Sequence, residues 1–318
     1  MKKIAFVFPG QGTQYVGMGA DFYKNEKKAQ EVYLEAERLS GQPIRKLCFQ
    51  GPEESLLSTI IQQPTIHTTE VALLRSLQAR EIYPDVCAGF SLGEYAALVC
   101  AGIMDFQDSL NLVIKRGPLI QAEVAVGVGK MALIIGLDKT KVMDIVEEAQ
   151  KEALVEISNY NSPKQLIISG YKVAVDKAID LAFKAGATKI FPLKVSAPFH
   201  TSLLKNAGTN LAKELKDVQL KPPVCTFIPN VTAKSLSNED VKDLLDKHIW
   251  YPVRWEESVS EMLKQGVELI VEVGPGRSLS RYNQEIIESL NGKAQTFSVQ
   301  NYEDILELEK IIKGEQGK

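Results

Sequence analysis

Residues 87–95, CAGFSLGEY, place Ser91 between two glycines in the spacing Gly-x-Ser-x-Gly, which is typical of a nucleophile at a sharp strand-to-helix turn. The free N–H groups at the start of the following helix would stabilise negative charge beside its hydroxyl. The pattern is short, so a purely structural turn is the alternative. The apolar stretch DVCAGF before the serine and the helical pattern LGEYAALVCA after it favour the nucleophile.

A serine hydroxyl becomes a good nucleophile only when a base takes its proton, and the chain has three histidines to offer. His67 lies early in an amphipathic helical pattern, where we expect a surface or capping residue. His248 lies near a predicted helix end, where cation-capable side chains are common. His200 follows VSAPF in a strand-end loop, where catalytic groups of α/β proteins gather, so we predict that His200 is the base.

The loop GQGTQ after the first apolar stretch is a candidate oxyanion site. Its residues Gly10 and Gly12 tolerate strained conformations and can bring backbone N–H groups close to a carbonyl, although a simple tight turn is the alternative. Arg116, in the segment KRG, would from sequence alone be expected at the surface, as most arginines are.

Short apolar strands alternate with amphipathic helices along most of the chain, which predicts an α/β fold with a largely parallel sheet. Helical patterns cover 20–40 and 66–80, and Asp105 is expected to cap the helix that contains Arg116. The predicted strands of this sheet are KIAFVF, DVCAGF, CTFIPN, ELIVEVG and QTFSVQ.

The stretch from about 130 to 195 follows a different order, β-α-β-β-α-β, which is the ferredoxin-like unit. We therefore predict a small subdomain over 129–195, inserted into a large catalytic domain made of 1–128 and 196–318. The elements expected in the insertion are strands 131–137, 154–160, 165–170 and 189–195 with helices 139–152 and 173–185.

The composition of the 318 residues excludes several classes of protein. A net charge of −3 gives no support for nucleic-acid binding, and no apolar run approaches the roughly 20 residues that span a bilayer. The first apolar run is too short for a signal peptide, and the four cysteines form no C-x-x-C pair. We expect a cytoplasmic protein with reduced core thiols, no metal site and no membrane or nucleic-acid partner.

Taken together and in order, eight segments resemble the malonyl-CoA:acyl carrier protein transacylases, the acyltransferases of bacterial fatty acid synthesis, whose fold also serves polyketide synthases. The resemblance runs from Ile4 to about Tyr302 and implies an α/β-hydrolase-like domain that carries a ferredoxin-like subdomain. The matching segments are FPGQGTQYVGMG, QPTIHTTEVALL, GFSLGEYAALVCAG, KRGPLIQ, NYNSPKQLIISG, VSAPFH, YPVRW and VGPGRSLS.

The resemblance implies a catalytic dyad of Ser91 and His200, with the histidine oriented by a backbone carbonyl instead of a carboxylate. It places the oxyanion hole at the backbone N–H groups of Leu92 and Gln11. It also implies that Arg116 binds the free carboxylate of malonate through paired, charge-assisted hydrogen bonds.

Further roles follow from the same resemblance. Gln63 matches a glutamine that lines the pocket, and Asn159 and Asn161 match positions near the thioester and pantetheine path. Phe199, just before the predicted base, goes with malonyl rather than methylmalonyl selectivity in related polyketide enzymes, because a phenyl ring fills the space of a methyl branch. The alternative is that Phe199 faces the core and only fixes the loop.

Two positions depart from the family pattern. Phe90 replaces the histidine usual before the serine, which removes a polar neighbour but not the base. His248 stands where many members have a glutamine whose backbone carbonyl steadies the base. Because a carbonyl does not depend on the side chain, we expect the role to persist, with a second imidazole near the site.

The implied function is a two-step transfer of malonyl from malonyl-CoA to an acyl carrier protein by a monomer. No cofactor is expected, since the phosphopantetheine is carried by the partner. A free-standing polyketide acyltransferase is the nearest alternative. A thioester hydrolase is disfavoured by the lack of a His-Gly-Gly-Gly motif and of an evident Asp between serine and histidine. The presence of Ser91, His200 and Arg116 together argues against a silent docking subunit.

Overall fold

The computed structural model describes residues 2–125, 127–237 and 239–314, which form two sheets. One has five parallel strands in the order β7-β2-β1-β8-β9, and this confirms the predicted parallel sheet. The carboxyl ends of its strands therefore lie along one edge. The strands are β1 (Ile4–Phe8), β2 (Val86–Gly89), β7 (Thr226–Ile228), β8 (Leu269–Val273) and β9 (Gln295–Val299).

The central strand β1, IAFVF, is buried at every position because both faces of the sheet are covered. Phe6 and Phe8 pack into an apolar core on one face, whereas Ala5 and Val7 pack into a second core on the other face. A continuous apolar run, without polar alternation, is what a strand in this position requires.

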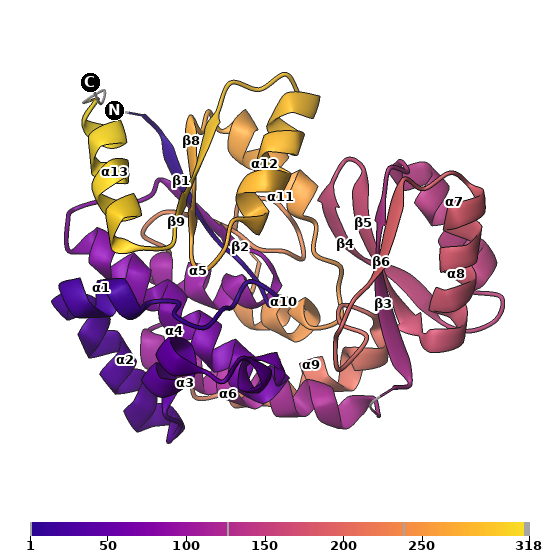
Figure 1. The fold of residues 1–318 in the computed structure, drawn as a ribbon, viewed down its shortest axis with the longest axis horizontal. Helices are drawn as coiled ribbons and strands as arrows, with labels where there is room; N and C mark the ends of the chain where they lie inside the picture. The colour runs from indigo at the N-terminus through magenta and orange to yellow at the C-terminus, as the bar shows by residue number, and fades with distance from the viewer. Residues whose placement is uncertain (1, 126, 238, 315–318) are drawn as a thin grey trace.

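Helices cover both faces of the parallel sheet (Figure 1). The second core is closed by α11 (Trp255–Lys264) and α12 (Ser278–Ser289). The remaining helices of this part are α1 (Ala20–Asn25), α2 (Lys27–Ser40), α3 (Ile44–Gln50), α4 (Thr59–Gln78), α5 (Glu94–Cys100), α6 (Phe106–Glu123), α9 (Lys205–Glu214), α10 (Val241–His248) and α13 (Tyr302–Lys313).

Two helix boundaries differ from the sequence prediction. The helix expected over 66–80 begins at Thr59 and contains Pro64, a residue that normally ends a helix because it lacks an N–H donor. Nearly all of α4 is buried, and this packing outweighs the lost hydrogen bond. The helix expected over 20–40 is interrupted at Glu26, which has extended backbone angles.

The second sheet is antiparallel, with the order β4-β5-β3-β6, and α7 and α8 pack against it (Figure 1). This is the predicted βαββαβ unit, although its last strand ends three residues before the expected Val195. The elements are β3 (Gly129–Ile135), α7 (Lys139–Ala149), β4 (Val155–Ser162), β5 (Gln165–Tyr171), α8 (Lys172–Lys184) and β6 (Lys189–Pro192).

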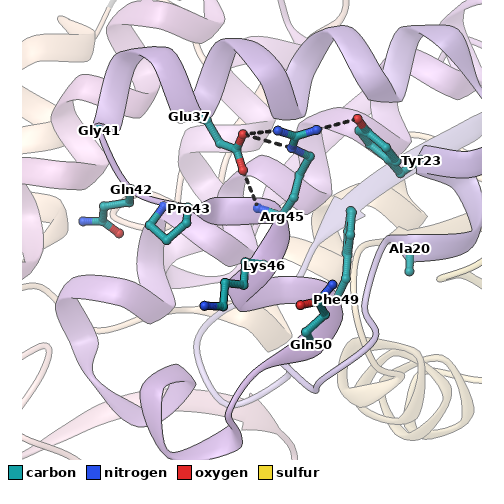
Figure 2. A pocket seen from close by; sticks show the side chains of 10 residues that line it. All are labelled: Ala20, Tyr23, Glu37, Gly41, Gln42, Pro43, Arg45, Lys46, Phe49 and Gln50. Carbon is teal, nitrogen blue, oxygen red and sulfur yellow. Dashed lines mark hydrogen bonds and ion pairs between the residues drawn. The ribbon is translucent and has the colours of Figure 1, made fainter.

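A cavity of about 690 Å³ lies beside α1, α2 and α3 (Figure 2). Its arginine, Arg45, donates to the Glu37 carboxylate and to the Tyr23 hydroxyl, so its charge is already paired. Neither Ser91 nor His200 lines this cavity. These contacts connect α1, α2 and α3, and the Ser91–His200 pair lies in a different part of the molecule.

The described part of the chain contains no membrane-spanning helix, no disulfide bond and no cluster of metal ligands. No helix there combines the length and the hydropathy that a bilayer crossing requires. The cysteines among these residues, Cys48, Cys87, Cys100 and Cys225, are free thiols. No cluster of three potential metal ligands occurs within the same residues.

Candidate active site

Ser91 occupies a strained turn between β2 and α5, with a positive φ of 51°. The flanking glycines are required by close packing. A Cβ on Gly89 would lie 2.0 Å from the carbonyl carbon of Gly93, and a Cβ on Gly93 would lie 2.1 Å from the carbonyl oxygen of Phe8. The Gly-x-Ser-x-Gly spacing therefore reflects a turn pressed against the central strand.

The hydroxyl of Ser91 lies 2.6 Å from Nε2 of His200. The other ring nitrogen, Nδ1, lies 2.9 Å from the carbonyl oxygen of Tyr251. A carbonyl can only accept, so Nδ1 carries the proton and Nε2 is free to accept from the serine. Burial, reinforced by the charge of Arg116, lowers the pKa of His200 to about 3. The imidazole is therefore neutral at neutral pH, as a base must be.

The backbone after α10 orients His200 at more than one point. We predicted the backbone of residue 248, and this backbone does hydrogen-bond to the His200 ring, but Nδ1 also meets the carbonyl of Tyr251 at 2.9 Å, three residues further along. The chain after α10 folds back along the histidine, so that the backbone N–H of His200 also donates to the Ile249 carbonyl at 3.2 Å. The contacts of Tyr251 and Ile249 were not predicted, because they depend on how this segment folds back.

His248 places a second imidazole beside the dyad, as expected. Its ring centroid lies 6.0 Å from that of His200, and its Nε2 donates to the backbone carbonyl of Ser91 at 3.0 Å. Burial, together with the charge of Arg116, holds the pKa of His248 well below its usual value. The side chain is thus a neutral donor to the serine backbone and does not contact the serine hydroxyl through Nε2.

The expectation of a surface or capping role for His67 is wrong. Its side chain is fully buried, stacks on Phe106 with ring centroids 5.7 Å apart, and pairs with the Ser109 hydroxyl at 3.0 Å. Burial lowers its pKa to about 3. Nearly all residues of α4 are buried, so the helix has no exposed face on which a histidine could lie.

Arg116 is fully buried in α6, contrary to what composition alone suggests. None of its three side-chain nitrogens has a hydrogen-bond partner among the described residues. Burial lowers its pKa, and the nearby Tyr95 and Glu94 oppose this lowering. The Tyr95 ring lies 5.9 Å from the guanidinium carbon, and its hydroxyl favours the charged form of Arg116 without reaching the geometry of a full hydrogen bond. An unpaired buried cation is costly, so this geometry favours binding of an anion.

A cavity of about 390 Å³ opens onto Ser91 and His200. Its walls come from the loop after β1, the start of α4, the open face of the antiparallel sheet and the segment before the histidine. The lining residues are Gln11, Gly12, Gln14, Leu57, Thr59, Gln62, Phe90, Ser91, Met131, Asn159, Ile167, Leu193, Lys194, Val195, Ser196, Phe199 and His200. Both sheets therefore contribute to one cavity.

The predicted glutamine and asparagine residues divide into two groups. Gln11 and Asn159 line the cavity, whereas Gln63 is fully buried behind it and donates to the Gln11 side chain at 3.1 Å. The adjacent Gln62, which the sequence analysis missed, lines the cavity and accepts from Gln11. Asn161 is buried in β4 and does not line the cavity, so the structure does not bring it to the wall where Asn159 lies.

Two aromatic residues complete the site. Phe90 lines the cavity and packs edge-on against Trp255, with ring centroids 5.7 Å apart. Phe199 lines the cavity and is also part of the main apolar core, with 8% of its surface exposed. The two interpretations of Phe199, contact with the acyl group and support of the loop, are therefore compatible.

Residues 5–306 match the family model described as "Acyl transferase domain". The malonyl CoA-acyl carrier protein transacylase of Escherichia coli (strain K12) is 42% identical over 296 residues, which cover 92% of this chain and 96% of that protein. The protein of the same name from Bacillus subtilis (strain 168) is 37% identical over 307 residues, 96% of each chain.

Solved structures agree with this fold. The malonyl CoA-acyl carrier protein transacylase of Clostridium perfringens superposes with a TM-score of 0.93 at 33% identity, over 98% of each chain. A malonyl-transacylase in complex with its type II polyketide acyl-carrier protein gives a TM-score of 0.91 at 37% identity, over 96% of this chain and 98% of that one. The chain belongs to the acyl transferase domain family.

Proposed function

We propose that the protein transfers a malonyl group from malonyl-CoA to the phosphopantetheine thiol of an acyl carrier protein, in fatty acid biosynthesis. The observation that carries this proposal is the pairing of a Ser91–His200 hydrogen bond with the buried, unpartnered guanidinium of Arg116. The first group forms an acyl ester, and the second binds a carboxylate. The names of the relatives support the same reaction.

In the first half-reaction, Nε2 of His200 takes the hydroxyl proton while Oγ of Ser91 attacks the thioester carbonyl. We assign the oxyanion to the backbone N–H groups of Leu92 and Gln11, which follow the nucleophile and the first strand. The thiolate of coenzyme A leaves and receives the proton from His200. The Tyr251 carbonyl keeps the ring in the required tautomer throughout.

In the second half-reaction, the phosphopantetheine thiol gives its proton to His200 and attacks the malonyl-serine ester. The ester bond breaks, and the Ser91 oxygen recovers the proton. Each step exchanges an acyl group and a proton between nucleophiles, so we expect no cofactor beyond the phosphopantetheine of the partner. The remaining proposals, a cytoplasmic location and a monomeric enzyme, follow from the sequence analysis.

A small acidic acyl group is supported by the cavity together with the buried guanidinium of Arg116, which does not line it. Arg116 would pair with the free carboxylate through two parallel hydrogen bonds. Gln11 is held by Gln62 and Gln63, which fixes the loop assigned to the oxyanion. Asn159 and Phe199 lie on the cavity wall. We assign Asn159 to the thioester and pantetheine path, and Phe199 to the exclusion of a branched acyl group.

Intact-mass analysis tests this function. Wild type with malonyl-CoA should gain one malonyl group, and addition of a phosphopantetheine-bearing carrier should remove it and give malonyl-carrier. Ser91→Ala should gain nothing. Release of free malonate with an unmodified carrier would show a thioester hydrolase instead.

A free-standing polyketide acyltransferase stays the second candidate, because the neighbour in complex with a polyketide carrier has the same fold. Competition between a fatty acid carrier and a polyketide carrier separates the two. A preference for the polyketide carrier would reassign the pathway.

A further inference from the structure

Asn230, a buried residue two positions past the end of β7, reaches the nucleophile turn. Strands β2 and β7 pair in parallel, with Ala88 opposite Ile228, so Asn230 lies level with Phe90. Its Oδ1 accepts from the backbone N–H of Ser91 at 2.8 Å, and its Nδ2 donates to the carbonyl of Gly89. One side-chain amide thus bonds the backbone on both sides of Phe90.

This amide continues the sheet after the strand has ended. The ladder donors of β7 alternate from Thr226, which donates to Asp85, so the next one after the strand is the backbone N–H of Asn230, and this N–H goes to Glu94 instead of to β2. The side chain of Asn230 supplies the donor and the acceptor in its place. Ser91, with its positive φ, leaves the ladder geometry, so its N–H would have no strand partner of the usual kind.

Glu94 fixes the orientation of this amide. It is buried at the start of α5, and its Oε2 accepts both from the backbone N–H of Asn230, at 2.6 Å, and from Nδ2. The Gly89 carbonyl can only accept and the Ser91 N–H can only donate, so the NH₂ group, which also faces Glu94, must face Gly89 and Oδ1 must face Ser91. The flip of the amide is therefore determined by its neighbours.

The carbonyl of Ser91 is held as well, because the His248 imidazole donates to it at 3.0 Å. Both polar groups of the Ser91 backbone are thus bonded to side chains from distant segments. Hydrogen bonds of this kind can keep a strained turn in a single conformation. They also leave the Ser91 N–H unavailable to an oxyanion, which fits an oxyanion hole built from other backbone N–H groups.

We propose that Asn230, oriented by Glu94, and His248 are positioning residues that clamp the Ser91 backbone and aim its hydroxyl at His200. This role rests on Ser91 being the nucleophile of the proposed function, but it does not depend on which acyl group is transferred. A probe that reacts with Ser91 without a carboxylate can therefore test the clamp separately.

The probe is phenylmethanesulfonyl fluoride, with sulfonylation of Ser91 followed by intact mass. Asn230→Asp removes the donor to both Glu94 and the Gly89 carbonyl, and it sets two carboxyl groups face to face. We expect the sulfonylation rate constant to fall roughly tenfold or more, the size expected when buried hydrogen-bonding groups lose their partners. Adding Glu94→Gln should recover only part of the lost rate, because the new amide donates to the aspartate while the Gly89 carbonyl stays without its donor.

Asn283→Asp is the matched control, because Asn283 is also buried and accepts from the Trp255 indole at 2.9 Å, and it reaches the turn only indirectly, through the packing of Trp255 on Phe90. It should lower the melting temperature but leave the sulfonylation rate of the folded protein unchanged. An unchanged rate for Asn230→Asp, or no recovery on adding Glu94→Gln, overturns the proposal.

Should Asn230→Asp fail to fold, His248 tests the other half of the clamp. His248→Leu should slow sulfonylation roughly tenfold, and His248→Gln, whose amide can donate to the same carbonyl, should recover most of the rate. Equal rates for the two variants would contradict the clamp. If the sulfonylation rates agree with these expectations but the wild type does not transfer malonyl, the positioning role of these residues is supported and the proposed substrate is wrong.

Discussion

The two sheets contribute to the cavity in different ways. The parallel sheet brings Ser91 to the carboxyl end of β2, where the strand ends of such sheets converge on ligands. The antiparallel sheet contributes Met131, Asn159 and Ile167, which lie along one face of the wall. The turn at the end of a parallel strand thus positions the reacting serine, whereas the antiparallel sheet forms part of the cavity wall.

Substitution of Ser91 or His200 should have the largest effect on the acylation rate. Ser91→Ala should abolish acylation by malonyl-CoA, and His200→Ala should slow it by roughly 10² to 10⁴ because no other group takes the proton. Single-turnover acylation measured by intact mass provides the rates. His248→Ala is the control, with a loss of roughly tenfold. A larger loss for His248→Ala than for His200→Ala would make the base assignment wrong.

Arg116→Ala tests the carboxylate-binding role proposed for the buried guanidinium, which lies outside the lining of the cavity. Without the guanidinium, the carboxylate of malonyl is desolvated and unpaired, at a cost of about 2–5 kcal/mol in malonyl transfer. Acetyl transfer should hold or rise, because acetyl has no carboxylate to bind. The ratio of kcat/KM for the two acyl groups is the measurement. An equal loss for both would remove Arg116 from carboxylate binding.

Phe199→Ser tests the segment that joins the two sheets. A packed phenyl ring leaves no room for an extra methyl group, which predicts a wild-type preference for malonyl over methylmalonyl of roughly 10- to 200-fold. The variant should show a smaller preference in a direct competition between the two thioesters. A fall in both rates at a constant ratio would mean that Phe199 only supports the loop.

Asn159→Ala tests the antiparallel wall, where we expect a modest effect. Loss of one hydrogen-bonding group should change kcat/KM by about tenfold or less, mainly through KM, since no proton or acyl bond depends on it. Asn161→Ala, in the same strand but outside the cavity, serves as the comparison and should leave KM unchanged. A hundredfold loss in kcat for Asn159→Ala would contradict this comparison, because it would mean that the antiparallel sheet takes part in the reaction and does not only line the cavity.

The acylation rate should hardly change with pH between pH 7 and pH 5. The base form of His200 is neutral, and its pKa of about 3 keeps it neutral from pH 7 to pH 5. The acylation rate should therefore change by less than about twofold, whereas an ordinary histidine would lose about 25-fold over the same range. The raised pKa of Glu94, about 8 through burial, lies above this window. An acid limb near pH 6.5 would contradict the buried, neutral base.

Much of the molecule was determined by local sequence. The continuous apolar run of β1, the turn around Ser91 and the βαββαβ order of 129–195 follow from periodicity and from residues that permit only certain backbone angles. These signals lie within a few residues of the feature that they predict. The same holds for the cap of α6, where Asp105 accepts from the N–H of Asp108 at 3.0 Å, as expected.

The tertiary structure alone decided which polar groups are buried and what they meet. Arg116 and His67 were expected at the surface from their own segments, yet packing of α4 and α6 encloses both. Tyr251 and Asn230 reach the catalytic turn only because segments far apart in the chain fold back on it. Burial and partnership depend on what lies across the fold, and no local periodicity carries that information.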